Sequence, residues 1–109
     1  MEIKGVFCDL HIHSRYSRAC SKDITIENLV KWAKIKGLSL LGTGDFTHPL
    51  WLNEIKEKLV ERDGLYWYDN FPFILSSEIS LVYTQNNKGR RVHLVFLAPS
   101  LEVVDKINN

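Results

Sequence analysis

Residues 4–13 of the chain alternate between apolar and polar side chains. Successive side chains of a β-strand point to opposite faces, so this alternation predicts a strand. Its apolar face carries Val6, Cys8, Leu10 and Ile12, and its other face carries Phe7, Asp9, His11 and His13. The chain is therefore expected to use one side of this strand for packing and to present two histidines on the other.

Two later segments have the periodicity of helices. Thr25 is expected to cap a helix that runs to about Lys36 and ends at Gly37. Pro49 suits the first position of a second helix, which is expected to close at Gly64. The predicted buried stripes are Ile26, Leu29, Val30 and Ala33 in the first helix, and Leu52, Ile55 and Leu59 in the second.

Apolar runs between and after these helices predict further strands. The first covers residues 38–42, and two more cover residues 73–84 and 91–98. Residues 85–90 are rich in turn formers, so the last two strands are expected to form a hairpin. Residues 65–72 are interpreted as an aromatic-rich connection.

The order of these elements predicts the fold class. Strands that alternate with helices are typical of an α/β fold with a parallel sheet or barrel. A final helix, capped by Ser100 and starting at Leu101, reaches the last residue after barely two turns. Because closing such a barrel takes about eight strands, residues 1–109 are interpreted as the incomplete N-terminal part of one. The open side is expected to expose apolar surface and to favour self-association.

The composition is that of an ordinary globular protein, with 45% hydrophobic and 25% charged residues. The formal net charge of +1 means that any binding of nucleic acid depends on local basic patches.

Cys8 and Cys20 lack the spacing of a thiolate zinc site and suit a reducing compartment. There is no long apolar run, so we expect a cytoplasmic protein without a membrane partner.

The pair His11 and His13 is the sharpest chemical signal. Residues two apart on a strand project from one face, so both imidazoles can reach one metal ion. Asp9 lies on the same predicted face and can orient a ligand or a bound water. The alternative is two surface histidines on an edge strand. We favour metal binding, because the opposite face of the strand is apolar and Asp9 shares the face of the two histidines.

Four more residues occupy positions suited to an active site. Asp45 and His48 follow a predicted strand, and parallel α/β folds place their active sites at such strand ends. The alternative is that Asp45 is a turn residue and that His48 is a neighbour of a helix N-cap. Glu78 and His93 are polar residues inside otherwise apolar strands, and a buried carboxylate is costly unless it is paired or metal-bound. A lone histidine like His93 is more often a satisfied core residue.

Taken together, these motifs resemble a known superfamily. Asp9–Ser14, the turn Gly42-Thr43-Gly44-Asp45, the Ser77-Glu78 strand and His93 are similar, in this order, to the first three motifs of the polymerase and histidinol phosphatase (PHP) superfamily. The resemblance implies a distorted (β/α)7 barrel, of which residues 1–109 are the N-terminal portion. More narrowly, HSRYSRACSKD, KWAKIKGL and LGTGDFTHP resemble the PHP domain of the endonuclease Q family.

The resemblance implies a role for each motif residue. His11 and His13 match the first metal-ligand pair, Glu78 the carboxylate that bridges two metals, and His93 a ligand of the second metal. Two or three divalent ions, zinc, manganese or magnesium, are expected as cofactors. Further family ligands are not found in these residues, so the 109 residues alone are expected to be inactive.

The second family motif departs from the usual pattern. Asp45 matches the aspartate of this motif, but Phe46 stands where the family usually has a histidine, and the nearest histidine is His48. Asp45 and His48 are expected to be catalytic. Arg15 and Arg18 follow the histidine pair and can clamp a phosphate, with solvated loop arginines as the alternative. Residues 66–68 are expected to pack rather than to stack on an extruded base.

The predicted function is metal-dependent hydrolysis of phosphodiesters. The resemblance to the endonuclease Q family implies a DNA repair enzyme that cuts on the 5′ side of deaminated bases. The basic hairpin tip, Lys88, Arg90 and Arg91, is either solvated or touches the DNA backbone. The alternatives are a phosphatase that acts on a small phosphomonoester and a non-catalytic fragment. An amidohydrolase barrel ranks lower, because no metal-binding lysine can be placed at a strand end.

Overall fold

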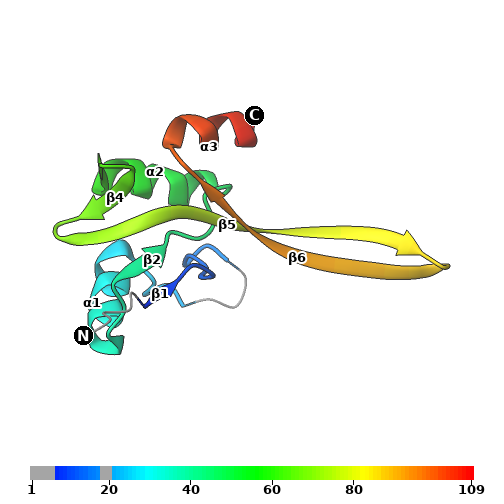
Figure 1. The fold of residues 1–109 in the computed structure, drawn as a ribbon, viewed down its shortest axis with the longest axis horizontal. Coiled ribbons are helices and arrows are strands. Elements are labelled where there is room, and N and C mark those ends of the chain that lie inside the picture. The colour runs from blue at the N-terminus through cyan, green and yellow to red at the C-terminus, as the bar shows by residue number, and fades with distance from the viewer. Residues whose placement is uncertain (1–6, 18–20) are drawn as a thin grey trace, which may run out of the picture.

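The computed structural model describes residues 7–17 and 21–109. Its elements form a mixed α/β fold, drawn as a ribbon in Figure 1. The helices are α1 (Ile26–Lys36), α2 (Pro49–Lys58) and α3 (Leu101–Asn108). The strands are β1 (Cys8–Asp9), β2 (Leu40–Gly42), β3 (Val60–Arg62), β4 (Leu65–Tyr68), β5 (Phe71–Gln85) and β6 (Lys88–Ala98).

The capping residues define the helix ends largely as the sequence predicts. The Thr25 side chain accepts a hydrogen bond from the Asn28 N–H, and Gly37 closes α1 in the left-handed conformation. The Ser100 side chain caps α3 in the same way as Thr25 caps α1. Gly64, however, does not close the second helix, because α2 already ends at Lys58.

Strands β3 and β4 are the main departure from the predicted element order. They pair antiparallel, with Val60 opposite Trp67 and Arg62 opposite Leu65. Asp63 and Gly64 join them, and both have positive φ, at 55° and 81°. This pair of left-handed residues forms the tight turn typical of a two-residue hairpin. Part of the predicted aromatic connection is therefore a strand.

The sheet is mixed rather than wholly parallel. Its path runs β1-β2-β5-β4-β3, and β6 pairs with β5 off this path. The predicted parallel order of the first three strands is confirmed, with Cys8 opposite Leu40 and Leu41 opposite Phe73. The β5–β4 and β5–β6 pairs are antiparallel. The described strands are thus part of a sheet, and they do not close a barrel among themselves.

The first strand is shorter than its alternating sequence predicts. Only Cys8 and Asp9 pair with β2, and the following segment 10–13 leaves the sheet. Phe7 and Cys8 are exposed, whereas Ile12 packs against the core. Val6, which was expected on the apolar face, lies outside the described residues.

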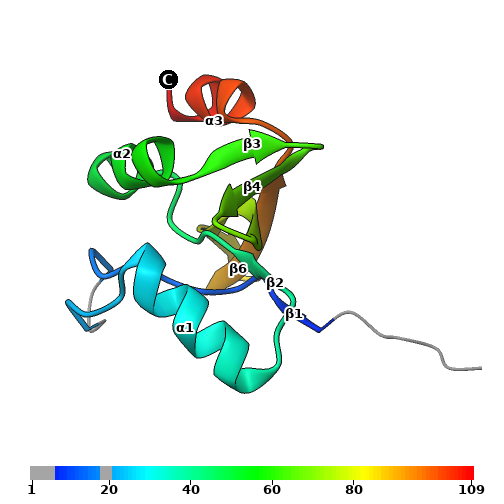
Figure 2. The ribbon, with the colours of Figure 1, turned by 90° about the vertical axis from the view of Figure 1, so that its left-hand side faces the viewer.

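One hydrophobic core joins the helices to the inner ends of the strands. Ile26, Trp51, Ile55, Phe73 and Leu75 are fully buried in it. The Trp51 indole N–H donates to the Thr43 carbonyl at 3.0 Å, so this large side chain is buried without an unpaired donor. In Figure 2, α1 lies below the strands and α3 above them. Within the described residues, none of the helices has the length and apolar character to span a membrane.

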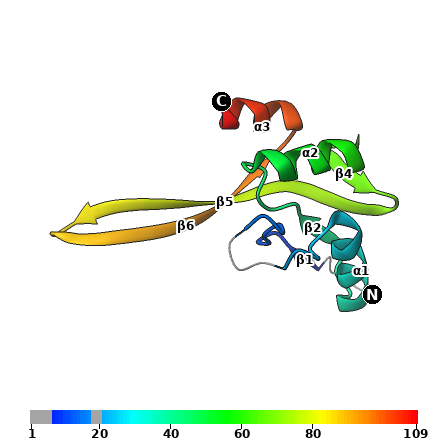
Figure 3. The same cartoon turned by 180° about the vertical axis from the view of Figure 1, so that it is seen from behind.

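The β5–β6 hairpin extends far beyond this core. The ladder between the two strands runs without a bulge from Leu75–Ala98 to Gln85–Lys88, but β2 and β4 flank only the first part of β5. The remainder projects as a two-stranded ribbon beyond every helix, seen from both sides in Figures 1 and 3. The predicted hairpin is confirmed, while its outer half stands apart from the sheet, contrary to the expectation that the whole of it belongs there.

The outer ribbon has two unlike faces. Directly opposed residues of an antiparallel pair share a face, and successive residues alternate between faces. The front face consists of Glu78, Ser80, Val82, Thr84, Arg91, His93 and Val95. The back face consists of Ile79, Leu81, Tyr83, Val92 and Leu94, followed by Arg90, Gln85 and Lys88 near the tip. The back face is therefore an apolar stripe near the body of the molecule and polar near the tip.

This apolar stripe predicts self-association through the back face. Replacing Leu81, which is 49% exposed, by lysine is expected to shift the chain toward monomer, because a charge in a buried apolar interface is costly. Light scattering after size exclusion measures the change. Val82→Lys is the matched control, since Val82 is 70% exposed on the front face. Equal effects of both substitutions would contradict the assignment of the interface to the back face.

Candidate metal centre

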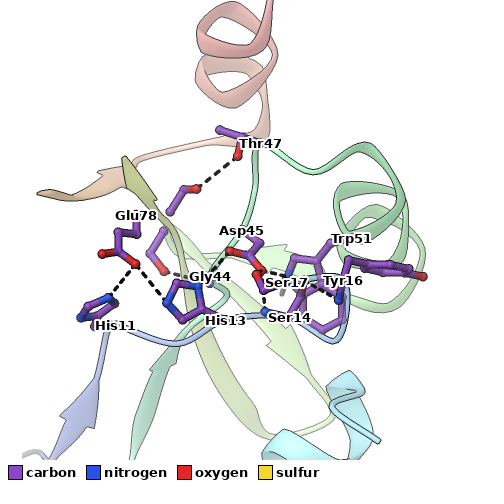
Figure 4. Close-up of polar contacts among 12 residues, drawn as sticks. His11, His13, Ser14, Tyr16, Ser17, Gly44, Asp45, Thr47, Trp51 and Glu78 are labelled. Carbon is purple, nitrogen blue, oxygen red and sulfur yellow. Dashed lines mark hydrogen bonds and ion pairs between the residues drawn. The ribbon is translucent and has the colours of Figure 1, made fainter. Parts of the chain in front are cut away.

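Three imidazoles surround the carboxylate of Glu78. The Nε2 atoms of His11 and His13 lie 3.1 and 3.0 Å from Glu78 Oε2. The Nδ1 atom of His93 lies 2.8 Å from the other oxygen, Oε1. Figure 4 shows His11 and His13 turned toward Glu78 from one side. The structure thus brings together the four residues that the sequence predicts as metal ligands.

Two separate parts of the chain supply these residues. His11 and His13 follow β1 and lie on the body of the molecule. Glu78 and His93 share the front face of the ribbon, where His93 stands opposite Ser80, one front-face position beyond Glu78. The Ser80 hydroxyl lies 2.9 Å from His93 Nδ1. The cluster therefore forms where β5 leaves the sheet.

Asp45 lies behind His13 and fixes its orientation. One carboxylate oxygen lies 3.4 Å from His13 Nδ1, while His13 Nε2 faces Glu78. The other oxygen accepts hydrogen bonds from the Ser14 N–H at 2.6 Å, from the Ser14 hydroxyl at 2.7 Å and from the Ser17 hydroxyl. A carboxylate that accepts from one ring nitrogen leaves the other nitrogen free to bind a metal.

The pKa of Asp45 stays below its ordinary value. Burial alone would raise it, but the hydrogen bonds from Ser17 and Ser14 outweigh this effect. The pKa of Glu78 is also lowered, chiefly because His11 donates a hydrogen bond to it. Both groups are therefore carboxylates near neutral pH, which is the form needed to accept a proton or to bind a cation.

Two glycines allow the segment 10–13 to approach the turn that carries Asp45. A Cβ on Gly44 would lie 2.2 Å from the Ile12 carbonyl oxygen, and Gly44 has a φ of +67°. A Cβ on Gly42 would meet the Ser76 hydroxyl at 2.5 Å and the Leu10 carbonyl oxygen at 2.7 Å. Any larger residue would push the histidine segment away from Asp45.

The donor set fits a divalent metal ion such as zinc. Ligand atoms of His11, His13 and Glu78 all lie within 4.8 Å of one another. Atoms that share one tetrahedral zinc ion at about 2.0–2.2 Å each lie about 3.3–3.6 Å apart, so a small outward movement would admit an ion. Imidazole nitrogens with a carboxylate are also the usual catalytic zinc ligands.

Other residues predicted for the site have structural partners instead. His48 caps α2, accepting from the Leu50 N–H at 3.3 Å, and its ring stacks on Tyr16. The Arg15 guanidinium pairs with Glu54 and donates to the Tyr16 hydroxyl. The geometry therefore supports neither a catalytic His48 nor a phosphate clamp at Arg15.

Four further residues from the sequence analysis are placed as follows. Phe46, at the position of the usual family histidine, is fully buried in the core and supplies no ligand. Asp9 accepts from the backbone N–H of His11 at 3.1 Å rather than from an imidazole. Arg18 lies outside the described residues. Tyr66 is buried and its hydroxyl accepts from the Leu101 N–H, in agreement with the packing interpretation.

The serines that hold Asp45 were missed from the sequence. Ser14 is fully buried, and Ser17 reaches the same carboxylate oxygen. The signal in the sequence is Ser14 directly after the histidine pair and Ser17 three residues later. A carboxylate on a tight glycine turn needs donors, and short hydroxyl side chains on a facing loop are the natural source.

The fold is similar to part of two solved endonuclease structures. Two solved structures share the fold over 94% of this chain. The lesion-specific endonuclease from Pyrococcus furiosus is 34% identical, with a TM-score of 0.79. Endonuclease Q in complex with a 27-mer duplex substrate with an abasic lesion at the active site is 37% identical, with a TM-score of 0.80. This chain covers 24% and 25% of them.

One curated relative is also similar over most of the chain. An uncharacterized protein of Methanocaldococcus jannaschii is 41% identical over 99 residues, which are 91% of this chain and 10% of that protein. No family model matches the chain. The chain thus spans about a tenth of the length of this relative and about a quarter of the solved nucleases.

Proposed function

We propose that this chain carries part of the active site of a metal-dependent endonuclease of the endonuclease Q type, which nicks DNA on the 5′ side of deaminated bases. In this proposal, residues 1–109 are the N-terminal portion of a PHP-type phosphoesterase domain with a distorted barrel. The observation that carries the proposal is the Glu78 carboxylate, whose two oxygens face different histidines. The similarity to two lesion-specific nucleases supports the choice of substrate.

The contacts suggest how the ligands would be shared. His11, His13 and Glu78 Oε2 would hold one divalent ion, and Glu78 Oε1 with His93 would hold a second. Bound ions at such a site neutralise charge on the phosphodiester and make a water nucleophilic near neutral pH. Glu78 would be shared by the two ligand sets, and Asp45 would orient His13 so that its Nε2 faces Glu78.

The exposure of two histidines of the cluster leaves it accessible to a polymeric substrate. The side chains of His11 and His93 are 53% and 52% exposed, and the front face of the ribbon continues away from them. Sites for small ligands usually enclose most of the ligand surface. A duplex, by contrast, needs an accessible and extended surface.

A chimera tests this proposal directly. The matching quarter of the Pyrococcus furiosus endonuclease is replaced by this chain, and the product is incubated with manganese or zinc and a labelled duplex that contains one hypoxanthine or uracil. Nicking beside the lesion is expected, and His11→Ala in the chimera should abolish it because a metal ligand is lost.

The controls separate the competing functions. An undamaged duplex of the same sequence should remain uncut, and circular dichroism verifies that each chimera is folded. A folded chimera that fails to nick damaged DNA but releases phosphate rapidly from a small monoester would move the assignment to a phosphatase. A folded chimera without either activity would favour a non-catalytic module.

A further inference from the structure

The front face of the ribbon continues the surface of the metal centre without interruption. His93 already contacts Glu78, and Arg91 is the next front-face residue along β6. Two residues of a strand span about 7 Å, so Arg91 lies about 7 Å along the strand from His93. This distance is about the axial rise of two base pairs of DNA. Its side chain is exposed and has no hydrogen bond or ion pair with any residue that the structure describes.

The charge of the outer ribbon has one sign. Between Ile79 and Val92 the hairpin contains Lys88, Arg90 and Arg91 and neither aspartate nor glutamate. The rest of the chain has 11 basic and 13 acidic residues, a net charge of −2, so the chain as a whole has a net charge of only +1. Such a cluster of cations on a projecting, acid-free element is complementary to a polyanion. Arg91 is its front-face member, and Arg90 and Lys88 lie on the back face near the tip.

We infer that the front face of the ribbon binds the phosphodiester backbone of duplex DNA, with Arg91 as the phosphate contact nearest to the metal centre. This inference rests on the proposed function and adds a substrate-binding residue to it. Arginine presents a planar fork of donors that matches a phosphate group, and backbone contacts position a duplex without reading its sequence. Arg91 takes the role that the sequence suggested for Arg15, whose guanidinium is engaged by Glu54.

The dimensions of the ribbon fit such a role. Seven residues separate Glu78 from Gln85 at the tip, which corresponds to about 24 Å of strand, or about seven base pairs of a duplex. A duplex whose reacting phosphate lies at Glu78 would therefore run beside the whole outer ribbon. Arg90 and Lys88 lie on the back face, opposite Tyr83 and Gln85, so they are both farther along the ribbon from Glu78 than Arg91 is.

The neighbouring residues Arg90 and Arg91 give a matched test of this assignment. Both are exposed and lose the same charge on replacement by glutamine, but they lie on opposite faces of the ribbon. Binding of the 109-residue chain to a labelled, undamaged duplex is followed by fluorescence anisotropy in EDTA over a range of salt concentrations. Arg91→Gln is expected to weaken binding roughly tenfold at 0.1 M salt and to reduce the salt slope by about one.

Arg90→Gln should have a clearly smaller effect on both quantities. The inference is overturned if the two variants behave alike, if neither changes binding, or if the unsubstituted chain does not bind the duplex at low salt. It is also overturned if Arg91→Gln abolishes binding of inorganic phosphate, measured by calorimetry, while duplex binding is unchanged. Circular dichroism and the urea midpoint confirm that both variants remain folded.

These measurements need neither metal nor cleavage, so they separate this inference from the proposed function. A chimera that requires Arg91 for duplex binding but does not nick damaged DNA would reject the nuclease and support the binding surface. A chimera that nicks damaged DNA, combined with equal effects of Arg90→Gln and Arg91→Gln, would reject the binding surface and support the nuclease.

Discussion

Glu78→Gln is expected to lower the zinc affinity of the chain by at least about 100-fold, because it removes the one carboxylate that faces all three histidines of the cluster. Glutamine has nearly the same shape but presents a neutral amide, so the loss reports on charge and ligation rather than on packing. Affinity is measured by competition with a chelating dye at fixed pH.

Two further substitutions are expected to change zinc affinity less than Glu78→Gln does. Asp45→Asn should reduce zinc affinity roughly 10- to 100-fold, because Asp45 only orients His13 and does not face the ion itself. His48→Ala removes a histidine close in sequence but engaged in capping α2, so affinity should stay within about twofold while stability falls by about 1 kcal/mol. If His48→Ala impaired zinc binding as strongly as Glu78→Gln, the cluster described here would not be the metal site.

The second large effect is expected from Gly44→Ala, which should lower the free energy of unfolding by about 2–5 kcal/mol. A non-glycine residue at a φ of +67° costs roughly 1–2 kcal/mol, and the new methyl group would also overlap the Ile12 carbonyl oxygen. Urea denaturation, followed by tryptophan fluorescence to which the buried Trp51 contributes, measures the change.

Gly37→Ala is the matched control for this prediction. Gly37 has a similar φ of +77°, but a Cβ there would meet no atom within 4 Å. Its substitution isolates the conformational cost and should destabilise the chain by only about 1–2 kcal/mol. Equal losses at the two positions would mean that the close approach of Gly44 to the segment 10–13 contributes nothing to stability.

Local chemistry made much of the fold predictable from the sequence. Thr25, Gly37, Pro49 and Ser100 define helix ends through their own side chains or backbone freedom, so the prediction needed no tertiary information. The Asp63-Gly64 turn was missed although its signal was present. This dipeptide is among the strongest hairpin signals, but the preceding helical pattern led to its interpretation as a helix end.

The candidate site was predictable where its residues stand out from their own segments. His11, His13, Glu78 and His93 interrupt apolar patterns, and the structure brings them together, although metal binding stays a prediction. His48 and Arg15 stand out just as clearly, yet their partners are Leu50, Tyr16 and Glu54. The cap that His48 provides to Leu50 is local and agrees with the alternative interpretation of His48. The contacts of His48 with Tyr16 and of Arg15 with Glu54 depend on how α2 packs against the loop after His13, which no local pattern reveals.

The position of Glu78 at the point where β5 leaves the sheet has a mechanical consequence. His11 and His13 belong to the body, where Asp45 and the close approach of Gly44 hold their segment, whereas Glu78 and His93 move with the ribbon. A tilt of the ribbon at this joint leaves distances within each pair unchanged and alters those between the pairs. The ribbon acts as a lever arm of about 24 Å, so a force applied at its tip changes the spacing of the two halves of the cluster.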